Sequence, residues 1–191
     1  MNRRVFIVHG WGGSPTSDFF PWLREKLEEK GFEVIIPLMP DADSPKIENW
    51  VPHISKMVGK VDENTFFVGH SMGCQAILRF LETLPQGCKV GGAIFVAGFF
   101  HLTNIYTGED KGIAAPWLET GIDLKKVRDR LSKSVAIFSD NDPYVPLNNK
   151  EEYENKLGSK IIIEHNKGHF NPSDGVTEFP VALDAVFELA K

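Results

Sequence analysis

Short apolar runs alternate along the chain with longer segments whose apolar residues recur at helical spacing. Runs of Val, Ile and Phe that alternate in this way with helical segments predict βα units and a parallel sheet. The pattern therefore predicts a compact α/β fold, with mostly parallel strands and helices on both faces of the sheet. The expected strands are Arg3–Val8, Glu33–Pro37, Thr65–Val68, Gly92–Ala97, Ser134–Ser139 and Lys160–His165.

The segments between these strands have the spacing of amphipathic helices. The first helix should begin at a capping region at Ser14-Pro15-Thr16 and end at Lys30-Gly31, where glycine can adopt the left-handed conformation. Its buried face should carry Phe20, Leu23 and Leu27. The other expected helices are Ile47–Val58, Met72–Leu84, Leu124–Leu131, Asn149–Leu157 and Val176–Ala190.

The segment from Gly98 to Ile122 does not fit this alternation. Glycines, aromatic residues, Pro116 and polar residues follow one another there without a clear period. We expect this segment to form a long loop or a small cap over one end of the sheet. Long loops in compact domains are usually functional or mobile, so the segment is also expected to take part in substrate selection. The chain contains no internal repeat or linker, so residues 1–191 are expected to form one domain.

Composition and charge narrow the class of partner. The chain has 191 residues, 42% of them hydrophobic, and 21 Lys and Arg against 26 Asp and Glu give a net charge of −5. An acidic chain lacks the basic surface that nucleic acid or an anionic membrane selects. No apolar run is long enough to span a membrane, no signal peptide is present, and Cys74 and Cys88 form no disulfide framework. We expect a cytoplasmic protein with a small-molecule or protein partner.

The strongest chemical signal is Gly69-His70-Ser71-Met72-Gly73, which follows an apolar strand and leads into a helical pattern. Gly-x-Ser-x-Gly in this context is a nucleophile elbow, in which the serine occupies a sharp turn between strand and helix. Small residues at positions 69 and 73 let the two elements approach closely. The N–H groups at a helix N-terminus are unpaired, so the Met72 amide is a candidate oxyanion donor beside the candidate nucleophile Ser71.

A serine nucleophile needs a histidine base that is oriented by a carboxylate, and this fold supplies them in the order serine, acid, histidine. Asp140 and Asp142 both follow the strand that ends at Ser139. Asp142 is favoured because it lies far enough beyond the strand to reach across the loop. Asp140 is the alternative.

Two histidines follow the last expected strand. His169 is favoured as the base because the loop at Gly168 can present an imidazole, whereas His165 ends a strand and is more often structural. Their spacing resembles that of metal ligands. However, Gly168 would break a helix and no Glu follows His165, so no metal site is predicted.

A second glycine cluster, His9-Gly10-Trp11-Gly12-Gly13, lies between the first strand and the first helix. This is the location from which a hydrolase of this kind supplies its other oxyanion amide, and Gly10 and Trp11 are the candidates. A nucleotide-binding loop is the competing interpretation, but no Gly-Lys-Ser/Thr is present and Pro15 stands where Gly-x-Gly-x-x-Gly needs a glycine. No metal or organic cofactor is implied.

Aromatic residues are frequent in the loops expected around this site and could line an apolar acyl pocket. The pocket candidates are Phe99, Phe100, Trp117, Tyr144 and Phe170, with Trp11, Phe19, Phe20 and Tyr106 as further ones. The alternative is that these aromatic residues belong to the hydrophobic core, as most aromatic residues do, and Cys74 is likewise expected to be a buried, inert thiol.

These motifs together resemble the retinoblastoma-binding protein 9 family of small serine hydrolases within the α/β-hydrolase superfamily. The resemblance extends over nearly the whole chain, through Gly69–Gly73, the Asp142-Pro143 turn and Gly168-His169-Phe170. It implies a compact α/β-hydrolase fold with a minimal cap, and a nucleophile, acid and base at Ser71, Asp142 and His169. Neither cysteine lies in the Leu-x-Cys-x-Glu motif for a retinoblastoma-type partner, so that partner is not expected.

The expected activity is carboxylesterase-like hydrolysis of a small ester or an activated amide through an acyl-enzyme. The competing function is that of a binding or scaffold protein that retains the three residues but makes little use of them, because a fold alone does not fix function. Perhydrolase or lyase chemistry on the same residues is a further alternative.

Overall fold

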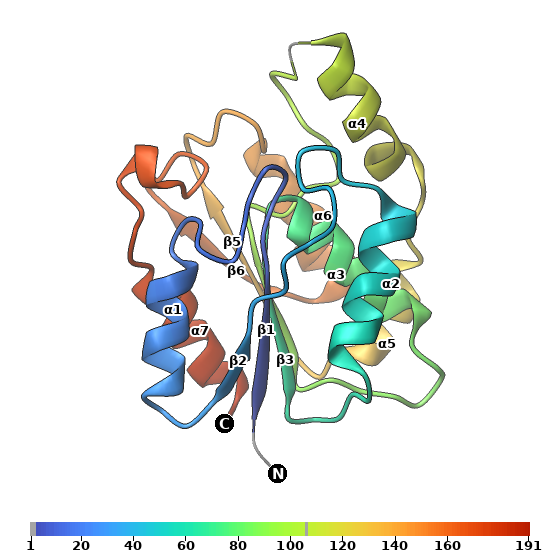
Figure 1. The fold of residues 1–191 in the computed structure, drawn as a ribbon, viewed down its shortest axis with the longest axis vertical. Coiled ribbons are helices and arrows are strands. Elements are labelled where there is room, and N and C mark those ends of the chain that lie inside the picture. Colours follow the sequence, from blue (N-terminus) through green and yellow to red (C-terminus); the bar gives the residue numbers. More distant parts are fainter. Residues whose placement is uncertain (1–2, 106) are drawn as a thin grey trace.

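The computed structural model describes residues 3–105 and 107–191, and a parallel six-stranded sheet forms its centre (Figure 1). The strands lie in the order β2-β1-β3-β4-β5-β6, and each neighbouring pair is parallel. Their bounds are Arg4–Val8 (β1), Glu33–Ile35 (β2), Thr65–His70 (β3), Gly92–Val96 (β4), Ser134–Ser139 (β5) and Lys160–Glu164 (β6). The predicted α/β fold is confirmed, and the carboxyl ends of all these strands lie at one edge of the sheet.

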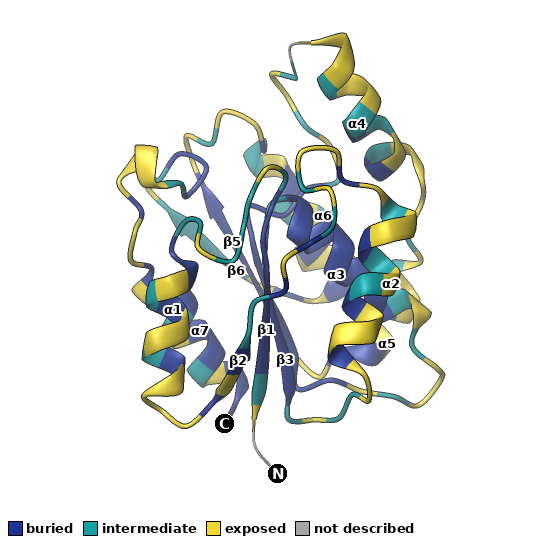
Figure 2. Cartoon of the chain, viewed as in Figure 1, coloured by how far each residue is buried: buried dark blue, intermediate teal, exposed yellow. Residues whose placement is uncertain are grey.

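Helices on both faces bury the central strands. Helices α1 (Phe20–Glu28) and α7 (Pro180–Leu189) lie together on one face, whereas α2 (Ile47–Val58), α3 (Met72–Thr83) and α5 (Leu124–Arg130) cover the other (Figure 1). Every residue of β3, β4 and β5 is buried, as the dark strands of Figure 2 show. Burial on two faces explains why these strands appear in the sequence as continuous apolar runs rather than alternating ones.

The first helix begins later than the sequence predicted. It starts at Phe20, because the hydroxyls expected to cap it are used in a separate turn. Ser14 Oγ accepts from the Thr16 amide at 3.3 Å, and it lies 3.2 Å from Thr16 Oγ1 and 2.9 Å from Ser17 Oγ. Side chains bonded within a local turn are not available to cap a helix. The predicted buried face is confirmed by Phe20, Leu23 and Leu27.

Other elements have shifted ends. Strand β3 continues past Val68 because Gly69 and His70 still pair with β4. The last helix begins at Pro180, not at Val176, in agreement with the preference of proline for the first turn. The expected helix over Asn149–Leu157 is instead a succession of three short pieces: a 3₁₀-helix η1 (Leu147–Asn149), α6 (Lys150–Glu152) and a π-helix η2 (Tyr153–Leu157).

Part of the segment between Gly98 and Ile122 is a helix that the sequence pattern did not predict. Helix α4 (Gly108–Glu119) begins with a capping box, in which the Thr107 hydroxyl accepts from the Asp110 amide at 2.9 Å and the Asp110 carboxylate accepts from the Thr107 amide. Most of its residues are exposed or half-buried (Figure 2), so its apolar positions have no helical period. It stands beyond the edge of the sheet where the strands end (Figure 1).

A buried aromatic side chain, that of Trp117, attaches α4 to the rest of the fold. The buried Trp117 donates from Nε1 to the Pro45 carbonyl at 2.9 Å, and its ring meets Trp50 of α2 edge to face at 5.8 Å. Of the described helices, none has the length and apolar character that crossing a bilayer requires.

Candidate active site

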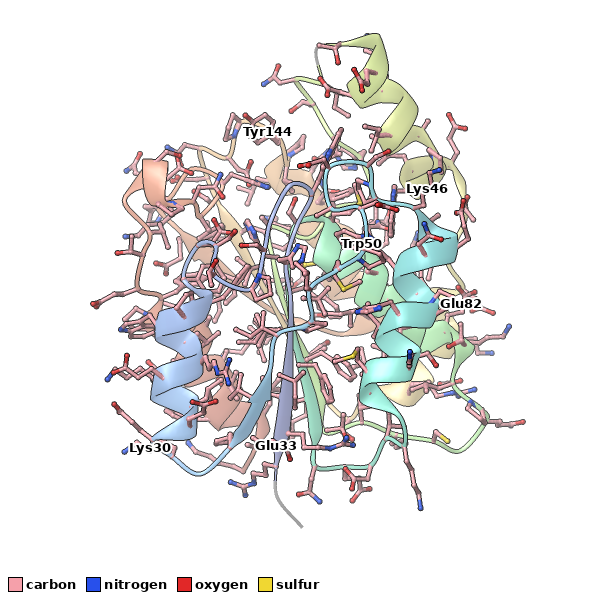
Figure 3. The ribbon with its side chains drawn as sticks, viewed as in Figure 1. Lys30, Glu33, Lys46, Trp50, Glu82 and Tyr144 are labelled. Atoms are coloured by element: carbon pink, nitrogen blue, oxygen red, sulfur yellow. The ribbon has the colours of Figure 1, made fainter. Side chains whose placement is uncertain are left out.

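A cavity of about 410 Å³ lies where the strands end, and the loops after β1, β3, β4, β5 and β6 all contribute to it. Tyr144, labelled in Figure 3, marks this end of the molecule, opposite Lys30 and Glu33. The residues that line this cavity are Gly10, Trp11, Gly12, Gly13, Ser17, Asp18, His70, Ser71, Met72, Phe99, Leu102, Tyr144, His169 and Asn171. The carboxyl ends of parallel strands are the usual location of ligand sites in open α/β sheets.

Ser71 occupies a strained turn between β3 and α3. Its backbone has φ 53° and ψ −118°, a region that residues with a side chain rarely adopt. The turn is fixed on both sides, because the Ser71 amide donates to the Val96 carbonyl and its own carbonyl accepts from the Cys74 amide, each at 2.9 Å. The close approach of strand and helix requires glycine: a Cβ at Gly69 would lie 2.9 Å from the Cys74 backbone, and one at Gly73 would overlap the Val8 carbonyl.

His169 and Asp142 form a buried pair beside this turn. His169 Nδ1 lies 2.8 Å from Asp142 Oδ2, and the Asp142 side chain is only 2% exposed. The other carboxylate oxygen accepts from the amides of Tyr144 and Val145, at 2.9 and 3.0 Å. A carboxylate can only accept here, so Nδ1 carries the proton and the neutral ring keeps its lone pair on Nε2.

The loop that carries His169 is held by hydrogen bonds from its neighbours. The Gly168 amide donates to Asn141 Oδ1 and the His169 amide donates to Asp174 Oδ2, both at 2.8 Å. Gly168 has φ 51°, and the Asp174 carboxylate occupies the place where a Cβ would lie. These contacts fix the backbone from which the imidazole projects. Nothing in the sequence pattern identified Asn141 or Asp174.

His70, which immediately precedes Ser71, is a second histidine at this site. Its Nε2 donates to the His169 carbonyl at 2.8 Å, and the centroids of the His70 and His169 rings are 5.0 Å apart. Its Nδ1 is buried without a hydrogen-bond partner among the described residues, 3.5 Å from the Asp18 carboxylate. His70 therefore holds the backbone of His169 in place, and Asp18 adds a carboxylate to the cavity wall that no motif predicted.

The two residues predicted to supply oxyanion amides, Trp11 and Met72, both line the cavity that holds Ser71. The Gly10 carbonyl accepts from His9 Nδ1 at 2.9 Å and from the Gly13 amide at 3.1 Å. In a trans peptide the N–H points opposite to the C=O, so the Trp11 N–H is directed away from these donors, and it has no backbone acceptor in the described part of the chain. Met72 is the first residue of α3, where the N–H has no partner within the helix.

His9 and Gly10 explain how this loop is positioned. His9 Nε2 accepts from the Met39 amide at 3.2 Å, and burial lowers the pKa of His9, so its ring is neutral and Nδ1 donates. Gly10 packs directly on the elbow: a Cβ there would lie 3.1 Å from Ser71 Cβ and 3.3 Å from the His70 carbonyl. Glycine is needed at position 10 for this close approach.

The alternative acid and base form a separate pair on the surface. Asp140 Oδ2 lies 2.5 Å from His165 Nδ1, and the His165 side chain is 77% exposed. Hydrogen bonds from the Asn166 amide and then from His165 lower the pKa of Asp140, and the bond to Asp140 raises the pKa of His165. Neither residue lines the cavity that holds Ser71.

The candidate pocket aromatics lie in different places. Phe99 and Tyr144 line the cavity, together with Trp11. Phe100 packs on Tyr153, Trp117 packs on Trp50, and the fully buried Phe170 packs on Phe179. Phe19 and Phe20 are buried against His70, and Tyr106 lies outside the described residues. Leu102, which the sequence analysis did not single out, joins Phe99 and Tyr144 as an apolar part of the wall.

Among residues 3–105 and 107–191, no three His, Cys, Asp or Glu side chains lie close enough to hold a metal ion. Cys74, next to the elbow, is fully buried, its Sγ lies 3.3 Å from the Val96 carbonyl, and burial raises the pKa of its thiol. A thiol in this state is a packing group and not a nucleophile.

Comparison with known proteins gives the family. A family model described as Serine hydrolase matches residues 5–188. The YdeN protein of Bacillus subtilis (strain 168) is 31% identical over 186 residues, which cover 97% of this chain and 95% of that protein. Serine hydrolase RBBP9 of Rattus norvegicus is 25% identical over 177 residues, which cover 90% of this chain and 89% of that protein.

Solved structures agree with this fold. The crystal structure of the ydeN gene product from B. subtilis has a TM-score of 0.90 at 29% identity and covers 99% of both chains. Est1E from Butyrivibrio proteoclasticus has a TM-score of 0.75 at 14% identity, covering 100% of this chain and 89% of that one, and this likeness concerns the fold alone. Since the family model spans nearly the whole chain and the fold agrees, this α/β-hydrolase protein belongs to the serine hydrolase family.

Proposed function

We propose that this hydrolase cleaves a small ester or an activated amide through Ser71, His169 and Asp142, with an acyl-enzyme intermediate. The observation that carries the proposal is the buried 2.8 Å contact between His169 Nδ1 and Asp142, in the same cavity wall as the strained Ser71. This contact leaves the lone pair of His169 Nε2 free to accept a proton.

In the first step, Ser71 Oγ attacks the substrate carbonyl while His169 Nε2 accepts the hydroxyl proton. The carbonyl oxygen becomes an oxyanion, which the amides of Met72 and Trp11 stabilise by hydrogen bonds. His169 then gives its proton to the departing alcohol or amine, and the bond to that group breaks. Asp142 stabilises the imidazolium that exists between the two proton transfers.

In the second step, water replaces the leaving group. His169 Nε2 accepts a proton from this water, whose oxygen attacks the acyl carbonyl. The same amides hold the second oxyanion. The bond between Ser71 Oγ and the acyl carbon then breaks, the serine recovers its proton from His169, and a carboxylic acid leaves the cavity.

The walls of the cavity suggest a substrate with two unlike sides. Phe99, Leu102 and Tyr144 come from the loops after β4 and β5, whereas Ser17 and Asp18 come from the loop after β1. In the sheet, β1 and β4 lie on opposite sides of β3, which carries Ser71. The proposed substrate therefore places an apolar group on the β4 side of the nucleophile, and on the β1 side a polar group that meets Ser17 and Asp18 beside Trp11.

Labelling with a fluorophosphonate tests the nucleophile. We expect one covalent adduct by intact mass on the wild type and no adduct on Ser71→Ala. Ser55→Ala removes an exposed hydroxyl on α2, so it serves as the matched control and should label like the wild type. Turnover of p-nitrophenyl esters should follow the same pattern.

Failure of this labelling would favour the other candidate function. If the folded wild type forms no adduct and hydrolyses no ester, the three residues do not act as a catalytic unit. The chain would then be a binding protein built on a hydrolase fold. Activity that survives in Ser71→Ala would instead reject the proposed nucleophile.

A further inference from the structure

Arg79 of α3 is a buried cation without an acidic partner in the described part of the chain. It is 5% exposed, and no carboxylate lies within 4.0 Å of its guanidinium. A buried charge is costly unless it is paired and hydrogen-bonded. Packing alone therefore does not explain how the buried positive charge of Arg79 is stabilised.

In the described part of the chain, the hydrogen bonds of the Arg79 guanidinium all come from one nitrogen, Nη2. Nη2 donates to the carbonyls of Trp117 and Thr120, at 2.9 and 2.8 Å, and more weakly to Gln75 Oε1 at 3.3 Å. The carbonyls belong to the end of α4, where the helix dipole favours a cation. Nε is buried without a partner, and burial lowers the pKa of Arg79. These contacts leave donor capacity on the other nitrogens.

A cavity of about 230 Å³ lies against this guanidinium, and none of its lining residues lines the candidate active site. Phe100, Trp117 and Leu124 form apolar parts of its wall, and Glu152 and Lys156 face it from α6 and η2. Lys156 and Glu152 are already paired with each other. With the guanidinium, the lining holds two cations and one carboxylate, which leaves it with one excess positive charge.

A second hollow adjoins the first and adds further positive charge. The two share Ile122, Leu124 and Lys156, and the second is also lined by Lys125 and Arg128. The opposing Asp123 is engaged at the start of α5, where its carboxylate accepts from the Lys126 amide. Nearby Glu82, labelled in Figure 3, accepts from the Asp123 amide. The region is locally basic in a chain whose net charge is −5.

We propose that the cavity beside Arg79 binds a small oxyanion, a carboxylate or a phosphate, with Arg79 as its principal partner and Lys156 at its rim. A guanidinium with free donors suits such oxygens better than a point charge does, because its donors form a planar fork. This site is separate from the serine, and the inference does not depend on the proposed hydrolase chemistry. It assigns a ligand to a buried cation that has no carboxylate within 4.0 Å in the described part of the chain.

Binding there should stabilise the contact between α4 and α3. Arg79 joins α3 to the end of α4, and Gln75, one turn earlier in α3, donates from Nε2 to the carbonyl of Phe99. Phe99 lines the cavity of Ser71. An oxyanion on Arg79 would therefore hold both ends of the segment between β4 and α5.

Thermal unfolding in sodium phosphate, sodium acetate and sodium chloride of equal ionic strength tests the proposal. At about a hundred times its dissociation constant, a bound oxyanion should raise the unfolding midpoint by roughly 5–10 °C. Phosphate and acetate arms distinguish the two oxyanions, and chloride reports the general effect of salt. A rise that is equal in all three salts overturns the proposal.

Variants locate the site. Arg79→Met should abolish the oxyanion effect, and Lys156→Met, which leaves the carbonyl bonds of Arg79 intact, should weaken it at least several-fold. Lys126→Met is the matched control, because Lys126 lies on α5 outside both hollows and should respond like the wild type. If Arg79→Met is stabilised by the oxyanion as much as the wild type is, the assignment to Arg79 is wrong. If Lys156→Met is stabilised as much as the wild type is, Lys156 is not a partner.

The active-site cavity is a second place where an oxyanion could bind. The stabilisation should therefore be measured again on protein whose serine already carries the fluorophosphonate adduct, which fills that cavity; if no adduct forms, the Arg79→Met variant alone locates the effect. An effect that persists in the labelled protein belongs to the Arg79 cavity. An effect that disappears belongs to the serine site and overturns the proposal.

Discussion

Asp142 and Asp140 are two residues apart, yet their surroundings differ in the property that matters for catalysis. The Asp142 carboxylate is buried and accepts from His169 and from two backbone amides, whereas the Asp140 carboxylate pairs with an exposed histidine. Only the first carboxylate can fix the tautomer of a histidine in the cavity wall. This difference leads to a direct comparison of two matched substitutions.

Asp142→Asn should lower kcat/KM for a p-nitrophenyl ester by roughly 10³–10⁴-fold, because the amide no longer stabilises the imidazolium or the required tautomer. Asp140→Asn makes the same chemical change outside the cavity and should leave kcat/KM within a factor of about two. Circular dichroism should show both variants folded. The opposite ranking of the two variants would identify Asp140 as the acid.

The surface pair gives a prediction about pH. His165 has a pKa above its ordinary value of 6.5, so its share of the pair's stability is present below 6.5 and is lost as pH rises through the raised value. Asp140 has a pKa below its ordinary value of 3.8, so its share is present above 3.8 and is lost as pH falls through the lowered value. The pair therefore contributes most between these two ordinary values.

Proton NMR of the His165 ring measures this interaction. In Asp140→Asn the pKa of His165 should fall toward 6.5, because the acceptor and its charge are removed. The ring signals of His169 at a fixed pH should keep their wild-type positions, since Asp142 still holds its ring. An unchanged His165 titration would mean that the pair does not form in solution.

The sequence could predict the residues that belong to a motif, but not the residues that position those motif residues in the fold. The elbow requires Gly69 and Gly73 beside Ser71, so the string itself indicates the turn, and the structure places all three there. By contrast, the contacts of His70 with the His169 carbonyl and of Asp174 with the His169 amide depend on how two loops pack. No local pattern encodes such packing.

At the level of elements, the buried strands were predictable and the exposed helix was not. Strands buried on both faces produce unmistakable apolar runs, whereas α4 buries few of its residues and so has no apolar period. Its signal was the capping box at Thr107 and Asp110. The hydroxyls at Ser14 and Thr16 misled in the opposite sense, because they bond within a turn of their own.

Trp117 should account for most of the energy that holds α4 in place. Trp117→Ala removes a fully packed ring and its hydrogen bond to the Pro45 carbonyl, and should lower the free energy of unfolding by about 3–5 kcal/mol in urea. Glu109→Ala changes an exposed position on the same helix and should stay within about 0.5 kcal/mol of the wild type. An unchanged stability in Trp117→Ala would show that α4 opens independently of the rest.

Across the whole molecule, the candidate site is a property of the complete sheet. Loops after β1, β3, β4, β5 and β6 each supply part of the cavity wall, and these strands are distant in sequence but adjacent in the sheet. The hydrogen bonds that position His169 cross from the loop after β5 to the loop after β6. The site therefore depends on long-range contacts that form only when the sheet is complete.

This dependence predicts that the reactivity of Ser71 and the global fold are lost together. In a urea titration, the midpoint for fluorophosphonate labelling should coincide with the midpoint for far-UV circular dichroism, because the loops around His169 are tied to β5 and to Asp174. Trp117→Ala should move both midpoints to lower urea by the same amount. If labelling instead disappears well before the helical signal, the site loops open as a separate unit of low stability, and the hydrogen bonds around His169 would be weaker than their geometry indicates.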